Sequence, residues 1–453
     1  MFAKISGVRR QVIISSCLYL GQLINGYSLS WTGPVIPKLR DLKQSPLPYL
    51  LTETQLSLVA TFIYLGSILG PYIVLWLSNI RGRKPCLISG GIIMVIAYVI
   101  LAISRNVAML YIGRFMVGVG GGAINVMNLV YIGEISSASI RGILLTTIGV
   151  FMTVGSIVLY ATGPYISYHG TTYIALAISV IFLFCLFFIP ESPIFFALQD
   201  RDEELRKVLQ DLGRFEDIDE TLKTKKELNS SKSSTIREWI ELFTVRSNRK
   251  ALFIVVIINI LQHCSGILPV VFFSAAIFDM AGSSIESGLA MIIVVCFQLS
   301  GSIVTPFFIE SVGRKKILIM SCALCSLSMF TLGLYFYLDH IGNPVISYIK
   351  WLPLVVLILF YIGYDSGLGI IPNAIIGEMF TTNVRSKGST ITMTTSWLFG
   401  FFVTTAFGAL LATVGGHVAF WFFACTCACA VLFTIFFIPE TKGKSLTEIQ
   451  EAL

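Results

Sequence analysis

Twelve apolar runs dominate the chain, and each is long enough to cross a lipid bilayer as a helix. A bilayer core about 30 Å thick needs roughly 20 apolar residues in helical form. Only 13% of the 453 residues are charged and 55% are apolar, so this much apolar surface cannot be hidden in a water-soluble core. The pattern predicts an all-α membrane protein with twelve transmembrane helices. The runs lie near residues 11–33, 55–78, 86–104, 109–133, 142–165, 171–189, 250–278, 287–309, 316–338, 351–377, 387–413 and 418–438.

A charged stretch at residues 190–249 separates the sixth run from the seventh, and its spacing predicts short amphipathic helices in a soluble linker, either a plain connector or a regulatory element. Three signals recur on its two sides in the same order: a basic turn after Gly82 or Gly313, a Glu and an Arg seven positions apart, and an IPE triplet. The repeat predicts two pseudo-symmetric six-helix bundles with a substrate site at their interface. The expected domains are 1–189, the intracellular linker 190–249, 250–438 and a cytosolic tail at 439–453.

The net charge of +7 follows the predicted topology. Most of the 32 Lys and Arg residues fall in segments that are cytosolic if the N-terminus lies inside, which is the usual bias of membrane proteins. Both termini are therefore expected in the cytosol, and a nucleic-acid partner is not expected. The first run is too long for the apolar part of a signal peptide, so we interpret it as the first span of a multi-pass plasma-membrane protein.

Residues that could ligate metals or catalyse reactions do not form a recognisable pattern. Most of the ten cysteines lie inside apolar runs, where packing explains them better than redox or metal chemistry, even for the CxxC pair Cys322 and Cys325. The four histidines are scattered, and the cytosolic segments contain no GxxxxGK[ST] loop. We therefore expect no metal, no cofactor and no enzymatic activity.

Arginines and glutamates recur at the predicted cytosolic ends of the spans. An Arg can hold a carboxylate through two parallel hydrogen bonds, and charge close to a membrane usually has a partner. We expect these groups to bridge the two halves when the cytosolic face is closed; the alternative is that they only anchor the topology. They are Arg83, Glu134, Arg141, Glu191, Glu310, Arg314, Glu378, Arg385 and Glu440.

Seven motifs in this order resemble those of the sugar porters of the major facilitator superfamily: NIRGRK, GRFMVGVGGG, YIGEISSASIRG, IPESP, VGRKK, GEMFTTNVR and IPETKGKSLTEI. The resemblance covers almost the whole chain. Within the family, the sequence is most similar to insect facilitated trehalose transporter-like proteins and more distantly similar to facilitative glucose transporters. The resemblance implies twelve helices, alternating access and a short intracellular helical domain between the halves.

The resemblance also implies a set of substrate-binding residues. They are Gln262, His263, Gln298, Asn373, Trp397 and the intramembrane acid Asp365. Several family positions are changed: Leu268 stands for an Asn, Phe272 and Phe273 stand for two tyrosines, and Gly149 stands for a Gln. Ser28 occupies the position of the Asp that proton-linked members carry, which favours facilitated diffusion.

The leading hypothesis is a carrier, functional as a monomer, that moves a trehalose- or hexose-like sugar down its gradient. Two alternatives remain at this point. The first is a carrier of a non-sugar small solute, suggested by Leu268 and by Asn373, which stands where the family has a Trp. The second is a transporter-like nutrient sensor, although the short tail after residue 438 offers little room for a signalling segment.

Overall fold

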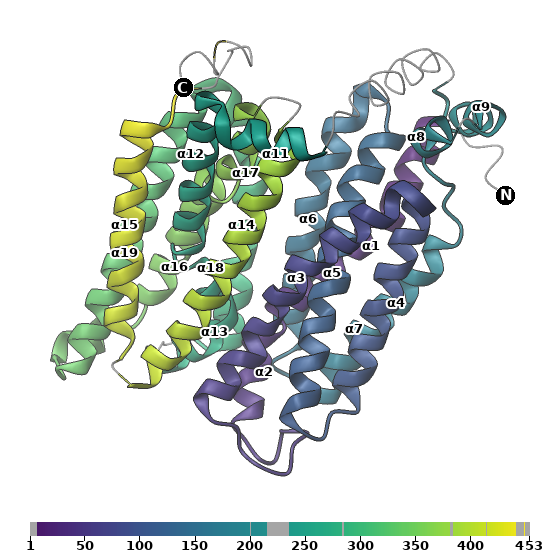
Figure 1. Cartoon of the computed structure of the whole chain (residues 1–453). Coiled ribbons are helices and arrows are strands. Elements are labelled where there is room, and N and C mark those ends of the chain that lie inside the picture. The colour runs from purple at the N-terminus through teal and green to yellow at the C-terminus, as the bar shows by residue number, and fades with distance from the viewer. Residues whose placement is uncertain are drawn as a thin grey trace.

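Two helical bundles lie side by side in this protein (Figure 1). The computed structural model describes residues 7–199, 201–214, 235–282, 285–380, 384–413, 415–440 and 448. Within these residues the regular secondary structure is helical, and no β-strand is present. The first half of the chain forms the purple and blue bundle and the second half forms the green and yellow one. This arrangement confirms the expected all-α fold; the domain boundaries between the bundles and the linker stay predictions.

The first half contains seven helices, of which the short α2 continues the span that α1 begins. They are α1 (Gly7–Ser30), α2 (Thr32–Leu39), α3 (Glu53–Arg81), α4 (Arg83–Ala102), α5 (Val107–Ile135), α6 (Ala138–Thr162) and α7 (Tyr168–Leu186). Three of the helices begin at a polar capping residue: Thr52 caps α3 in a capping box with Gln55, Asn106 caps α5, and Ser167 caps α7. These caps satisfy backbone N–H groups at the ends of helices that have lipid along much of their length.

The linker and the second half follow. The linker helices are α8 (Pro193–Leu198), α9 (Asp202–Asp211) and α11 (Thr235–Thr244). The helices of the second half are α12 (Arg246–His263), α13 (Ile267–Met280), α14 (Ser287–Val312), α15 (Arg314–His340), η3 (Pro344–Tyr348), α16 (Leu352–Gly363), η4 (Tyr364–Leu368), α17 (Ile371–Met379), α18 (Arg385–Thr413) and α19 (Gly416–Phe437).

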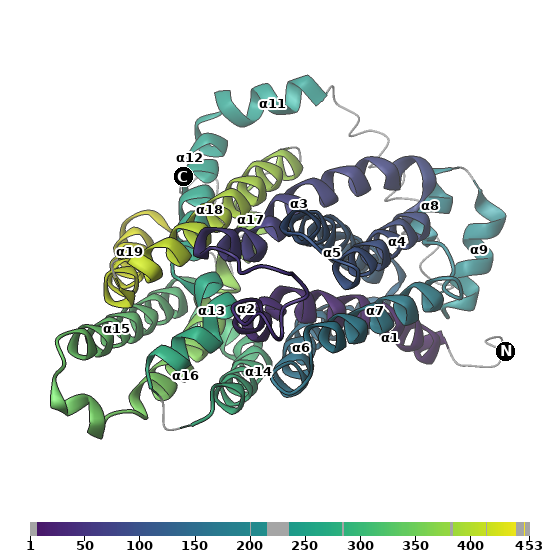
Figure 2. The ribbon, with the colours of Figure 1, turned by 90° about the horizontal axis from the view of Figure 1, so that it is seen from below.

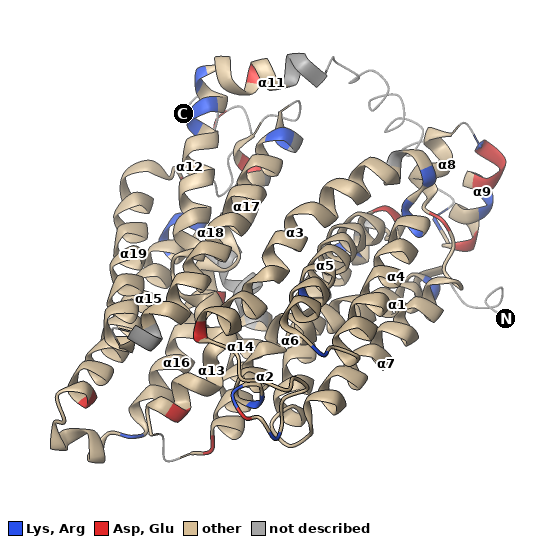
Figure 3. Cartoon of the chain, turned by 60° about the horizontal axis from the view of Figure 1, so that its bottom comes forward, with Lys and Arg blue, Asp and Glu red and all other residues tan. Residues whose placement is uncertain are grey.

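Eleven helical segments of the described residues are long and apolar enough to cross a membrane. The remaining one of the twelve expected runs, at residues 287–309, lies in α14. Its described apolar part, Ser287–Gly301, is shorter than the other eleven segments. Charged residues gather near the ends of the bundles and are sparse along the middle of the helices (Figure 3). The linker helices and both termini lie at one end of the molecule, which is the end expected in the cytosol.

The two halves are in contact near the opposite end, where α2 and α13 lie side by side (Figure 2), and along α3 and α18. The Tyr160 hydroxyl of α6 donates to the backbone carbonyl of Val271 in α13 at 3.2 Å. The same face of α6 is exposed at Gly149 and Thr146, which are closer to the end with the termini. The contact between the halves along α6 is therefore closed at the α2 end and exposed toward the termini.

Candidate functional site

Two spans of the second half are broken at the same depth, and their breaks touch. The seventh span is interrupted at residues 264–266 between α12 and α13, with Gly266 at a φ of 91°. The tenth span passes through the π-helix η4 before α17 begins. A break in a membrane helix leaves backbone N–H and C=O groups free to bind a solute, and such breaks are common at the substrate sites of transporters. The breaks therefore locate a candidate site inside the second half, facing the first.

Gln262 joins the two breaks. Its Nε2 atom donates to the Tyr364 hydroxyl at 3.2 Å and to the Gly369 carbonyl at 3.1 Å, while its buried Oε1 atom has no hydrogen-bond partner. One turn earlier, the buried Asn259 donates to the Pro372 carbonyl at 3.4 Å and to the Val255 carbonyl at 2.8 Å. Gln262 is recognisable from its sequence motif, whereas Asn259, one helical turn away on the same face of α12, is not.

A cluster of rings connects the broken spans to the first half. Trp397 of α18 lies edge-on to His263, with ring centroids 5.7 Å apart, and 5.6 Å from Tyr64 of α3. Tyr64 also stacks on Phe272, with centroids 5.5 Å apart. The His263 Nδ1 atom lies 3.0 Å from the Asn259 carbonyl, so Nδ1 carries the proton and the ring is oriented by its own helix. Tyr64 is a member of the site that the sequence did not reveal.

The remaining candidate binding residues are distributed around this junction. Asp365 is buried within η4, and a Cβ added at Gly301 of α14 would lie 3.7 Å from the Asp365 Cβ. Gln298 is half-buried on the same helix, one turn before Gly301. Asn373 is exposed on α17. The structure thus brings Gln262, His263 and Trp397 together, and places Asp365 and Gln298 on facing turns of η4 and α14.

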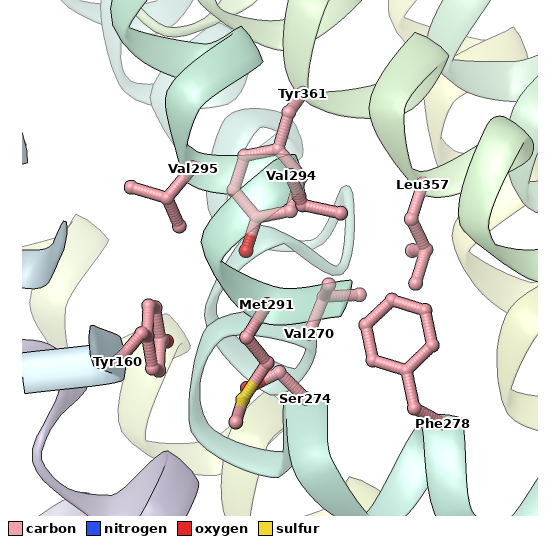
Figure 4. A pocket seen from close by; sticks show the side chains of 9 residues that line it. All are labelled: Tyr160, Val270, Ser274, Phe278, Met291, Val294, Val295, Leu357 and Tyr361. Atoms are coloured by element: carbon pink, nitrogen blue, oxygen red, sulfur yellow. The ribbon is translucent and has the colours of Figure 1, made fainter. Parts of the chain in front are cut away.

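A small recess lies beside the junction, lined by residues of α6, α13, α14 and α16 (Figure 4). Its lining is mostly apolar and includes two tyrosines, Tyr160 from the first half and Tyr361 from α16. Ser274 donates to the Met291 sulfur at 3.0 Å within it. The recess spans both halves, so its shape must change if they move relative to one another.

Arg114 is a buried charge in the first half that the sequence analysis missed. Its side chain is fully buried in α5; Nε donates to the Val59 carbonyl at 3.1 Å and Nη1 to the Ser28 carbonyl at 2.8 Å. The guanidinium carbon lies 5.3 Å from the centre of the Trp31 ring. Its partners are backbone oxygens and a ring, although an Arg within a span costs about 2.5–3.5 kcal/mol on insertion scales. An Arg inside an apolar run was the sequence signal that could have identified it.

The repeated basic turn has the same structure in both halves. Gly82 and Gly313 have φ values of 101° and 102°, in the region that favours glycine. Glu191 accepts hydrogen bonds from the backbone N–H groups of Arg83 at 3.0 Å and Lys84 at 3.1 Å. A carboxylate at a helix N-terminus is stabilised by the free N–H groups and the helix dipole. Burial raises the pKa of the Glu191 carboxyl, against these donors and the Arg83 charge, which lower it.

The second half repeats this arrangement. Glu440 accepts from the N–H groups of Arg314 at 3.0 Å and Lys315 at 3.2 Å. The side chain of Arg141 donates to the carbonyl five residues before it at 3.2 Å, and that of Arg385 does the same at 3.5 Å. Pseudo-symmetry between the halves therefore extends to individual hydrogen bonds.

The repeated basic turn of each half also takes part in an Arg–Glu ion pair. Arg83 binds Glu134 with Nη2–Oε1 at 3.0 Å and Nε–Oε2 at 3.0 Å, and Ser192 donates to the same carboxylate. Arg314 lies 3.5 Å from Glu378. Each pair lies within its own half, so the predicted bridge between the halves stays a prediction. The Glu310 side chain lies outside the described residues.

No group of three or more metal-ligating side chains is found in the described part of the chain.

Comparisons with known proteins agree with this architecture. The sequence profile of the family described as "Sugar (and other) transporter" matches residues 14–453. Facilitated trehalose transporter Tret1 of Polypedilum vanderplanki is 30% identical over 451 residues, which cover 98% of this chain and 88% of that protein. Tret1 of Anopheles gambiae is 30% identical over 446 residues, but this chain spans only 56% of its length. The inward-open structure of the xylose transporter XylE from E. coli has a TM-score of 0.81 at 22% identity, covering 98% of this chain and 99% of that one, which establishes the fold.

Proposed function

This chain belongs to the sugar transporter family of the major facilitator superfamily, and from that premise we propose that it carries a saccharide across a membrane by facilitated diffusion. The relatives at 30% identity are named for trehalose, so the proposed solute is trehalose or a hexose-like sugar. The observation that carries the proposal within this chain is Gln262, which joins two broken spans beside an aromatic cluster. Amide groups and aromatic faces are the partners that sugar hydroxyls and sugar rings need.

Alternating access accounts for the arrangement of the halves. They are tied together near the α2 end by Tyr160 and Val271, while the same face of α6 is exposed at Gly149 toward the termini. This pattern supports a state open toward the cytosol. In the opposite state, the Arg and Glu residues at the cytosolic ends would be close enough to exchange partners across the halves and close that face. Exchange is feasible because an Arg–Glu pair can re-form with a new partner at little net cost.

Diffusion without proton coupling is supported by the surroundings of Arg114. Its donors reach the carbonyls of Val59 and Ser28, and the Ser28 side chain is a hydroxyl rather than a carboxylate. A hydroxyl does not take up or release a proton at neutral pH, so this position cannot couple transport to a proton gradient. Asp365 is the buried acid that could still do so.

The proposal places the chain in the plasma membrane as a functional monomer, with both termini in the cytosol. No finding favours the non-sugar carrier or the sensor. The test is uptake of labelled trehalose, glucose, fructose and polyols by vesicles that contain the purified protein, with and without a proton gradient. We expect a saccharide to equilibrate without the gradient. Uptake of none of the saccharides would refute sugar transport, and accumulation only with the gradient would refute facilitation.

A further inference from the structure

Four side-chain amides lie along the contact between α1 and α5. They are Gln22 and Asn25 on α1 and Asn125 and Asn128 on α5. Asn25 Nδ2 donates to the Gly121 carbonyl at 3.2 Å, and Asn128 Nδ2 donates to the Leu18 carbonyl at 2.9 Å. These two bonds fix an antiparallel register between the helices. In that register the turn of α1 at Gln22 faces the turn of α5 near residue 125.

The position of Gln22 on α1 follows from its neighbours. Leu18 and Asn25 face α5, whereas Tyr19 donates to an α6 carbonyl at 2.8 Å and Gly26 packs against the α6 backbone. Gln22 is four residues after Leu18 and three after Tyr19, so it projects between these two faces. It therefore points into the space between α5 and α6.

Asn125 occupies the corresponding position on α5. Gly121 and Asn128 face α1, while Gly118 and Gly122 pack against the backbone of α3. Asn125 is four residues after Gly121 and three after Gly122, so it projects between α1 and α3. Its side chain is partly exposed, as is that of Asn25. The two partly exposed amides and the buried Gln22 thus lie on adjoining faces of the two helices.

Gln22 has no partner for either polar atom. Its side chain is fully buried, and neither Nε2 nor Oε1 makes a hydrogen bond. The Oδ1 atom of Asn128 is unpartnered as well. A buried amide without partners lowers stability, so its presence in a well-packed helix contact needs a ligand or a bound water to explain it. Space is available nearby, because Gly149 is exposed on α6 and no heavy atom lies within 4 Å of where its Cβ would be.

We propose that Gln22, Asn25 and Asn125 form a hydroxyl-binding subsite, here named the N-half amide subsite, which rests on the proposed function. An amide offers both donors and acceptors, and a sugar hydroxyl needs one of each. In the second half, the side chains of Leu268 and Phe272 have no polar atoms. The first half therefore supplies hydrogen bonds that the second half lacks: Asn25 and Asn125 at the accessible rim, and Gln22 beneath them.

The test compares three variants of the full-length protein. Gln22→Met and Asn125→Leu remove amides of the subsite. The control, Gln11→Met, makes the same change on the same helix where the amide is satisfied: Gln11 Nε2 donates to the Leu212 carbonyl at 2.8 Å, and Oε1 accepts from the Ser137 N–H at 2.9 Å. The measurements are the KM for labelled trehalose uptake into vesicles and the thermal unfolding temperature of the sugar-free protein.

Opposite effects on the two measurements identify the subsite. We expect Gln22→Met to unfold at the same or a higher temperature than the wild type, and both subsite variants to raise KM about tenfold, the ratio expected for a lost hydrogen bond. Gln11→Met should unfold earlier with KM unchanged. If the wild type transports trehalose and both subsite variants keep its KM, this inference is overturned and the proposed function is not. The same holds if Gln22→Met unfolds at a lower temperature than the wild type. Absence of wild-type transport overturns it together with the proposed function.

Discussion

The two Arg–Glu pairs of the repeated turns differ in burial, and this difference makes a quantitative prediction. The Arg83 and Glu134 side chains are 8% and 11% exposed and share three short contacts, whereas Arg314 and Glu378 are 25% and 28% exposed with one contact at 3.5 Å. Breaking a buried pair from one side typically costs about 3–5 kcal/mol, but a solvent-accessible pair is worth about 0–1 kcal/mol. Glu134→Gln should therefore cost about 3 kcal/mol, and Glu378→Gln less than about 1 kcal/mol.

The assay is thermal unfolding of purified protein, followed with a thiol-reactive dye. Cys86, Cys322 and Cys325 are fully buried and become reactive when the helices separate. Glu134→Gln and Glu378→Gln are matched controls for each other, because they make the same chemical change at equivalent positions of the two halves. The double variant should show the sum of the single effects, since the two pairs share no side chain.

The order of the two effects is decisive. If Glu378→Gln lowers the unfolding temperature as much as Glu134→Gln does, burial does not determine the strength of these pairs. If the double variant is far from additive, the pairs are coupled across the halves in the purified protein. The first result would refute the link between burial and pair strength, and the second would refute the assignment of each pair to a single half.

Four further substitutions test other parts of the structure. Gln262→Leu removes the two hydrogen bonds that Gln262 makes between the broken spans and should raise the KM for saccharide uptake at least about tenfold, with a smaller change in surface expression. Burial raises the folded-state pKa of Glu191, so its contribution to stability is greatest at low pH and is lost as pH rises through that pKa. The unfolding free energy of the wild type minus that of Glu191→Gln should therefore rise as pH falls from 7 toward 4. A fall in this difference over the same range would contradict the direction of the pKa shift. Gly82→Ala should destabilise the protein, because its φ of 101° disfavours a side chain and the new Cβ would lie 2.5 Å from a Glu191 oxygen. Gly149→Ala, where nothing lies within 4 Å, should leave the unfolding temperature unchanged or raise it.

The helices could be predicted from the sequence because each apolar run satisfies the length that a bilayer imposes. The repeated motifs also predicted that the chain has two halves, and the structure shows why the motifs repeat: Gly82 and Gly313 each start a helix that a distant Glu caps. The caps themselves could not be predicted, since Glu191 and Glu440 lie more than a hundred residues from the helices they stabilise.

The candidate site was only partly predictable. Gln262, His263 and Trp397 were identified by motif, but the breaks in the seventh and tenth spans leave no clear gap in the apolar pattern. Tyr64 and Asn259 look like ordinary packing residues until the neighbouring helices are placed. The Arg and Glu residues at the helix ends could be identified as a set, yet which Arg binds which Glu depends on distances between helices that the sequence does not contain.

Counterflow shows whether the protein is a carrier whose single saccharide site faces the two sides of the membrane in turn. Vesicles that contain the protein are preloaded with unlabelled trehalose or glucose and diluted into a trace of the same labelled sugar, with no ion gradient. A carrier whose two halves alternate around one saccharide site should take up label transiently above its equilibrium level. Absence of that overshoot for every saccharide tested, or an overshoot that requires a proton gradient, would contradict the account.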